Sequence, residues 1–136
     1  MIALRLLQVL EDVQGVTGSF VMTHAGDVLV QAMPGYFDQA ELRLAACRVS
    51  RILACGEANG LTPEDAVFDF GSGKLFVREF VRGYLCVLCD AEVNMRSLRL
   101  TARLVARGMP AEIDARGVPA ERSGAAPNAT SRRDAR

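Results

Sequence analysis

The run Tyr84-Leu85-Cys86-Val87-Leu88-Cys89 contains no polar residue and constrains the arrangement of the rest of the chain. A strand that is covered on one face alternates apolar and polar residues, whereas an unbroken apolar run indicates a strand buried on both faces of its sheet. The run is far shorter than the about 20 apolar residues that a membrane-spanning helix needs. We therefore expect helices to cover both faces of a sheet that contains this strand.

Four other β-rich runs are separated by turn residues. Residues 66–70 and 74–81 flank Gly71-Ser72-Gly73, and Arg82-Gly83 leads into the central run. Nearer the N-terminus, residues 16–23 and 28–31 have the pattern of a hairpin with a glycine in its turn. The sequence thus predicts five strands, two before and three after a long polar-apolar segment.

Helical periodicity marks three further segments. Apolar residues recur at helical spacing over residues 3–13, before Gly15. A long helix is expected from the N-cap Asp38, where Glu41 would complete a capping box, to Asn59-Gly60. A last helix is expected over residues 92–107. The order α-β-β-α-β-β-β-α predicts an α/β (α+β) three-layer sandwich.

The long helix has two apolar faces. At 100° per residue one face gathers Leu42, Ala45, Ala46, Val49, Ile52, Leu53 and Gly56. The opposite face carries Leu44, Cys47, Arg51, Ala54 and Cys55. Because this second face is unusually apolar for a solvated surface, it is a candidate contact surface.

Composition divides the chain near residue 107. The last 29 residues contain ten hydrophobic residues, of which seven are alanine, together with three prolines. Such a segment cannot offset its ordering entropy by burial, so we expect one domain over residues 1–107 and a disordered tail over 108–136, with at most a short helical turn near 111–116. The 16 basic and 16 acidic side chains give a formal net charge of zero, which argues against strong non-specific nucleic-acid binding.

The N-terminal apolar run lacks the layout of a secretory leader, because Arg5 lies inside it and Glu11 and Asp12 follow at once. We therefore expect a cytoplasmic protein whose four cysteines are reduced. Cys86 and Cys89 are three apart in a strand and point to opposite faces, so they form no metal or redox motif.

Other patterns that carry chemistry are weak. Gly71-Ser72-Gly73-Lys74 joins two strands and lacks the remaining residues of a phosphate-binding loop. His24 is the only histidine and lies in a predicted turn. The paired acidic residues lie at helix ends and turns, where solvated carboxylates are expected. The sequence predicts no catalytic residue, no cofactor and no metal site.

Two segments resemble the signature segments of the roadblock family of dynein light chains. The first is Gly15-Val16-Thr17-Gly18-Ser19-Phe20-Val21 with the turn at Gly26-Asp27. The second is Arg82-Gly83-Tyr84-Leu85-Cys86-Val87-Leu88 followed by Asn94-Met95-Arg96-Ser97-Leu98-Arg99. The resemblance covers residues 1 to about 107, although family members often have glycine where this chain has Arg96.

The resemblance implies a profilin-like fold with a five-stranded antiparallel sheet, the long helix on one face and the terminal helices on the other. It also implies a homodimer formed by the middle strand and the long helix. Carried onto this chain, the dimer interface would comprise Leu44, Cys47, Arg51, Ala54, Cys55, Ala66, Val67, Phe68, Asp69 and Phe70. Independently, an apolar edge strand over residues 67–70 would promote aggregation unless it were covered.

The activity that the resemblance implies is non-enzymatic: a scaffold or regulator of a Ras-like small GTPase, in bacteria one of the gliding-motility kind. Arg43, Arg48 and Arg51 would then contact the partner. An alternative is a small-ligand sensor of the profilin or PAS type, although Phe20, Phe68, Phe70, Phe76 and Phe80 are expected to fill its core. A thiol enzyme is least favoured because no cysteine has a basic residue in view.

Arg96, Arg99, Arg103 and Arg107 align along one side of the last predicted helix. They would either dock an acidic partner or phosphates, or form a solvated face whose last arginines favour the helix dipole. The sequence alone favours the solvated face.

Overall fold

The computed structural model describes residues 2–60 and 65–110. Its elements are α1 (Ile2–Leu10), β1 (Val16–Thr23), β2 (Val28–Ala32), α2 (Gln39–Ala58), β3 (Asp65–Asp69), β4 (Gly73–Phe80), β5 (Gly83–Asp90) and α3 (Met95–Gly108). The predicted order of elements is confirmed. The predicted tail covers residues 108–136, and all of it beyond residue 110 lies outside the described residues, as does the segment that leads into β3.

All five strands form one antiparallel sheet in the order β2-β1-β5-β4-β3. The central strand is β5. Its residue Cys86 lies opposite Phe20 of β1 on one side and opposite Val77 of β4 on the other. The position of β5 explains its unbroken apolar sequence, because it is the strand most enclosed by neighbours and by both helical layers. The two edge strands are β2 and β3.

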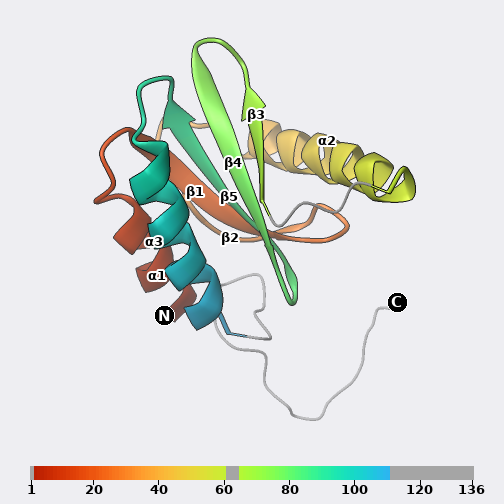
Figure 1. The fold of residues 1–136 in the computed structure, drawn as a ribbon, viewed down its shortest axis with the longest axis horizontal. Helices are drawn as coiled ribbons and strands as arrows, with labels where there is room; N and C mark the ends of the chain where they lie inside the picture. The colour runs from red at the N-terminus through yellow and green to blue at the C-terminus, as the bar shows by residue number, and fades with distance from the viewer. Residues whose placement is uncertain (1, 61–64, 111–136) are drawn as a thin grey trace.

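Helices lie on both faces of the sheet (Figure 1), and an apolar core lies under each helical layer. On one face α1 and α3 pack against alternate strand residues such as Val21, Phe76 and Leu85. On the other face α2 inserts Leu42 and Ala46 between further strand residues. This arrangement confirms the predicted three layers, with α2 on one side and the terminal helices together on the other.

The first and last helices are shorter than expected, for identifiable reasons. α1 ends at Leu10 and the following turn still buries Val13. α3 begins at Met95 instead of residue 92, because the Asn94 side chain accepts a hydrogen bond from the N–H of Ser97 and so caps the helix. The preceding residues form a turn in which the Asp90 carboxylate accepts from the backbone N–H of Glu92 (3.0 Å).

The predicted N-cap of α2 is confirmed, with a different bond. The Asp38 carboxylate accepts a hydrogen bond from the N–H of Ala40 (2.9 Å), whereas a capping box would engage the N–H of Glu41.

The last helix, α3, reaches Gly108, and Met109 is buried against the α1–α3 core. No helix within the described ranges combines the length and the apolar character needed to cross a bilayer.

Candidate interaction surface

The second face of α2 is exposed, as its sequence predicts. The helix turns Leu42, Ala46 and Val49 toward the sheet, which leaves the opposite face in solvent. The five residues expected on that face are all exposed: Leu44, Cys47, Arg51, Ala54 and Cys55. Leu44, the largest apolar residue of the five, keeps 52% of its surface accessible. A solvated helix face with this apolar content is a candidate surface for contact with another protein.

The buried face of α2 differs from the prediction at three positions. Ala45 and Ile52 were expected in the core but are exposed, Ile52 at 54%. Ser50 is buried instead, because its hydroxyl donates a hydrogen bond to the backbone carbonyl of His24 (2.7 Å). The β1–β2 turn therefore packs against α2 and shifts the buried stripe toward it.

The strand expected to pair with a second copy is at an edge. Among the described elements β3 is hydrogen-bonded to β4 alone, so its other side presents unpaired backbone groups. The register places Val67 opposite Phe76 and Phe68 opposite Leu75, residues that belong to different cores. Consequently Ala66 and Phe68 face the α2 side, whereas Val67 and Asp69 face the α1–α3 side.

Phe70 was expected both in the core and in the strand, and the structure places it in neither. It follows the end of β3, where its N–H donates to the carbonyl of Gly73 (2.9 Å), and 62% of its surface is exposed. Asp69 shapes the same turn by accepting from the N–H of Gly71. Of the five phenylalanines expected in the core, Phe20 and Phe76 are buried, and Phe68 and Phe80 are partly buried.

Basic side chains border the exposed face of α2. Arg43, Arg48 and Arg51 are all exposed, and α2 carries only Glu41 and Glu57 as acidic residues. Within residues 2–60 and 65–110 none of the three arginines forms an ion pair. They are available to acidic groups of a partner.

The cysteines divide as expected between the interior and the surface. Cys86 lies in the α2-side core and Cys89 in the α1–α3 core, so the two thiols face opposite sides of the sheet. Burial raises the pKa of both thiols above the ordinary value, and the neighbouring Asp90 adds to the effect at Cys89. Cys47 and Cys55 are exposed on α2.

No family model matches the sequence. An uncharacterized protein of Methanocaldococcus jannaschii is 28% identical over 112 residues, which cover 79% of this chain and 96% of that protein. Among solved structures, a Roadblock/LC7 domain from Streptomyces avermitilis superposes with a TM-score of 0.68 at 19% identity, covering 77% of this chain and 92% of that domain.

The gliding protein MglB from Thermus thermophilus gives a TM-score of 0.66 at 17% identity, over 79% of this chain and 84% of its own. MglC from Myxococcus xanthus gives 0.57 at 17% identity, over 79% and 95%. The chain has the roadblock/LC7 fold.

The predicted resemblance is thus confirmed at the level of fold. In this roadblock/LC7 fold, the expected interface residues lie on α2, on β3 and, for Phe70, in the turn that follows β3. Ala66 and Phe68 are on the α2 side of the sheet, but Phe68 packs into the α2-side core and is only partly accessible. The candidate contact surface therefore comprises the outer face of α2, the backbone edge of β3 with the exposed side chains of Val67 and Asp69, and the exposed ring of Phe70.

One polar cluster of this roadblock/LC7 fold was not predicted. A ring nitrogen of His24 lies 3.1 Å from Oε2 of Glu79, and the His24 ring meets the Tyr84 ring edge-on at 5.0 Å. Burial raises the pKa of the Tyr84 phenol, and the Glu79 carboxylate raises it further. His24 and Glu79 are 55 residues apart in sequence. Only the sheet register brings β4 and the β1–β2 turn together. Within the described chain no group of three His, Cys, Asp or Glu side chains is placed to hold a metal ion.

The ligand-sensor alternative requires space beneath the sheet. Between α2 and the sheet that space is occupied by Phe20, Met22, Val77 and Tyr84, each at most 6% exposed. A ligand there would have to displace these side chains.

Proposed function

We propose that this protein is a non-enzymatic homodimeric adaptor that binds a Ras-like small GTPase and modulates its GTP hydrolysis in the cytoplasm. The observation that carries the proposal is the combination, on a roadblock/LC7 fold, of an unpaired β3 edge with an exposed apolar face of α2. Each feature is unfavourable in an isolated monomer, since edge strands and apolar faces promote association.

Pairing of two β3 edges would extend the sheet across the dimer and satisfy the free backbone groups of both strands. The same contact would bring the two α2 helices together. Ala54 and Cys55 are small enough to allow the close approach that helix packing needs. The exposed Leu44 would then contribute apolar burial at the interface.

The partner class follows from the roadblock resemblance, and the solved structures that share the fold include a gliding protein, MglB of Thermus thermophilus. We assign the contact to Arg43, Arg48 and Arg51, because these exposed arginines border the α2 face without an intrachain carboxylate partner among the described residues. Their function would be to recognise acidic groups on the GTPase surface.

The homodimer is tested by placing a carboxylate on the outer face of α2. We expect the wild-type protein to elute as a dimer in size-exclusion chromatography with light scattering, and Ala54→Asp to elute as a monomer, because a carboxylate buried between helices is strongly disfavoured. Ala45→Asp is the matched control: Ala45 is also exposed, but it lies nine residues from Ala54 and therefore about 180° around the helix from it. A monomeric wild-type protein, or a dimeric Ala54→Asp, would contradict the proposal.

The GTPase is tested by affinity capture from a lysate of the source cell, with GDP or a non-hydrolysable GTP analogue, followed by mass spectrometry. We expect a small GTPase to be enriched in one nucleotide state and to be lost with Arg43→Glu/Arg48→Glu. Hydrolysis rates of the captured GTPase with and without this protein then measure the modulation. Recovery of the same proteins in both nucleotide states would remove the GTPase assignment and leave the dimer to be judged separately.

A further inference from the structure

The α1–α3 layer is basic and contains no acidic side chain. Neither the sequence of α1 nor that of α3 includes an aspartate or glutamate. The layer has five exposed arginines: Arg5, Arg96, Arg99, Arg103 and Arg107. Because the whole chain has no net charge, this excess of positive charge is a local property of one face.

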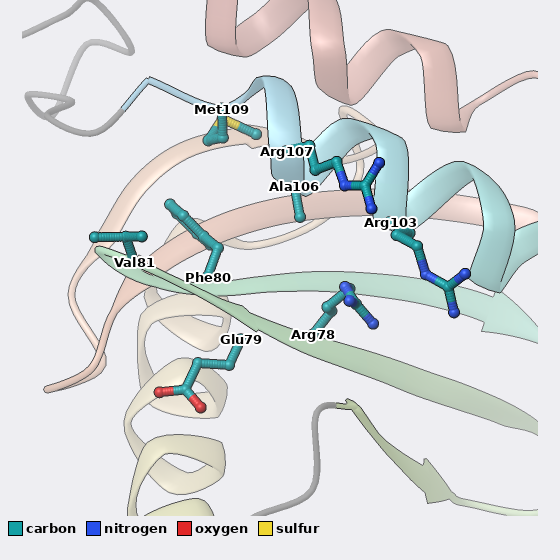
Figure 2. A pocket seen from close by; sticks show the side chains of 8 residues that line it. All are labelled: Arg78, Glu79, Phe80, Val81, Arg103, Ala106, Arg107 and Met109. Atoms are coloured by element: carbon teal, nitrogen blue, oxygen red, sulfur yellow. The ribbon is translucent and has the colours of Figure 1, made fainter.

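The basic side chains of α3 border a trough. Two hollows, of about 300 and 470 Å³, share Arg103 and together follow α3: the first is lined by residues of both β4 and α3, and the second by residues of α3 alone. In the first hollow Arg78 of β4 joins Arg103 and Arg107 on one side of the strand, as Figure 2 shows. Phe80, Ala106 and Met109 supply an apolar lining.

The acidic residues Glu79 and Asp65 lie next to the first hollow, but neither pairs with an arginine of α3. Glu79 lines the first hollow but points to the other side of β4 (Figure 2), where its carboxylate lies 3.1 Å from the His24 ring. Asp65 pairs with Arg78 at 3.3 Å. In the part of the chain that the structure describes, no carboxylate pairs with the four arginines of α3.

A solvated helix face does not account for this pattern. Arg107, in the last turn, does favour the helix dipole, but Arg96 lies in the first turn, where a positive charge is disfavoured. Arg99, Arg103 and Arg107 are successive i, i+4 neighbours, and like charges at this spacing repel. The arrangement lowers the stability of the isolated helix, so its benefit must come from something that the helix binds.

We propose that the trough along α3 binds an acidic segment of a partner protein that also carries apolar side chains. The twelve residues from Arg96 to Arg107 extend about 16 Å along the helix, which matches about three turns of a bound helix. Guanidinium groups on the rim would bind the carboxylates in bidentate fashion, and the lining of Phe80, Ala106 and Met109 would take an apolar side chain.

Other anionic occupants fit the trough less well. A single phosphate would engage only a fraction of its length. A bilayer is flat, so the apolar lining of a concave trough would stay out of reach of the lipid chains. A nucleic acid would lack the aromatic side chains on which single-stranded bases stack, since the chain has no tryptophan and the only aromatic residue lining either hollow is Phe80.

The probe for the test is a fluorescein-labelled 14-residue peptide built from leucine and glutamate with acidic residues at every third or fourth position, measured by fluorescence anisotropy. We expect saturable binding at 50 mM salt that weakens at least tenfold at 300 mM salt. Arg99→Glu/Arg103→Glu should weaken binding at least tenfold. The matched control Arg43→Glu/Arg48→Glu, on the other side of the sheet, should change it less than twofold.

Circular dichroism separates binding from folding. The α3 exchange leaves positions 99 and 103 like-charged, but it makes the i, i+4 pair with Arg107 and the i, i+3 pair with Arg96 attractive, so its melting temperature should not fall below that of the wild type. Equal binding of a peptide with glutamine in place of glutamate would overturn the proposal. Equal loss with both double variants would also overturn it. So would binding to vesicles with 30% phosphatidylserine in the absence of peptide binding, which would assign the surface to a membrane.

Discussion

Replacement of Gly26 by alanine tests whether the β1–β2 turn is locked against α2. Gly26 has φ of +96° in the turn that joins β1 and β2, and its N–H donates to the carbonyl of Thr23. A Cβ atom at this position would lie 3.0 Å from Cα of Cys47 and 3.2 Å from the carbonyl oxygen of Ala46. Both atoms belong to the backbone of α2, which cannot yield as a side chain can.

The expected cost has two parts. A left-handed backbone conformation costs a residue with a Cβ roughly 1–2 kcal/mol, and crowding of a well-packed contact costs roughly 1–3 kcal/mol. Together they predict that Gly26→Ala lowers the free energy of unfolding by about 3 kcal/mol, a large share of the stability of a domain of this size.

Two other glycines separate these contributions. Gly71 also has positive φ (+86°), but a Cβ there would meet no atom within 4 Å, so Gly71→Ala should cost only about 1 kcal/mol. Gly35 has neither a positive φ nor a neighbour within 4 Å, so Gly35→Ala should lie within about 0.5 kcal/mol of the wild type.

Urea denaturation at one fixed protein concentration measures all three variants, with unchanged m-values as the sign that unfolding remains comparable. If Gly26→Ala costs no more than Gly71→Ala, the turn does not pack against α2. The position of the exposed face of α2, which depends on this packing, would then have to be revised.

Two further predictions concern the core and the end of the folded part. Burial raises the pKa of the Cys86 thiol above its ordinary value of 9.0, so the thiol stays protonated in the folded state while the unfolded chain ionises. The contribution of this thiol to the free energy of unfolding is fully present below about pH 9. Above that pH the free energy of unfolding falls by up to about 1.4 kcal/mol per pH unit. Urea midpoints between pH 8 and 10.5 should therefore decline less steeply in Cys86→Ala than in the wild type, and equal slopes would contradict the assignment. Second, a chain that ends at Pro110 should melt at the same temperature as the full chain, whereas one that ends at Arg107 should melt lower, because it loses the buried Met109. A lower melting temperature for the chain ending at Pro110 would contradict the expected disorder of the segment beyond it.

The sequence was most informative where one physical requirement dominated. The apolar run of β5 could satisfy its composition only at the centre of a covered sheet, and that is its position. The end of a helix could be predicted where a single capping residue sets it, as Asp38 does at the start of α2. The predicted start of α3 was wrong, because residues 90–92 form a turn closed by Asp90 and the helix begins only after the cap at Asn94.

The surface was harder to predict, because exposure depends on contacts between distant residues. The helical wheel of α2 could not reveal that the β1–β2 turn buries Ser50 and leaves Ala45 and Ile52 outside. Phe70 is an aromatic residue of the kind found in protein cores, but it lies in a turn whose hydrogen bonds involve Asp69 and Gly73. The His24–Glu79 contact required the strand register, which no local pattern encodes.

The two basic surfaces lie on opposite faces of the sheet, and this separation has a functional consequence. Arg43 and Arg48 are on α2, whereas the trough that contains Arg103 is formed by α3 and β4 (Figures 1 and 2). A partner bound at α2 and an acidic segment bound at α3 would therefore not compete for space. Saturating the trough with the acidic peptide should leave GTPase capture unchanged, and each double variant should abolish only its own interaction. The proposed adaptor function requires this independence, and the central sheet would provide it by holding the two helical layers apart.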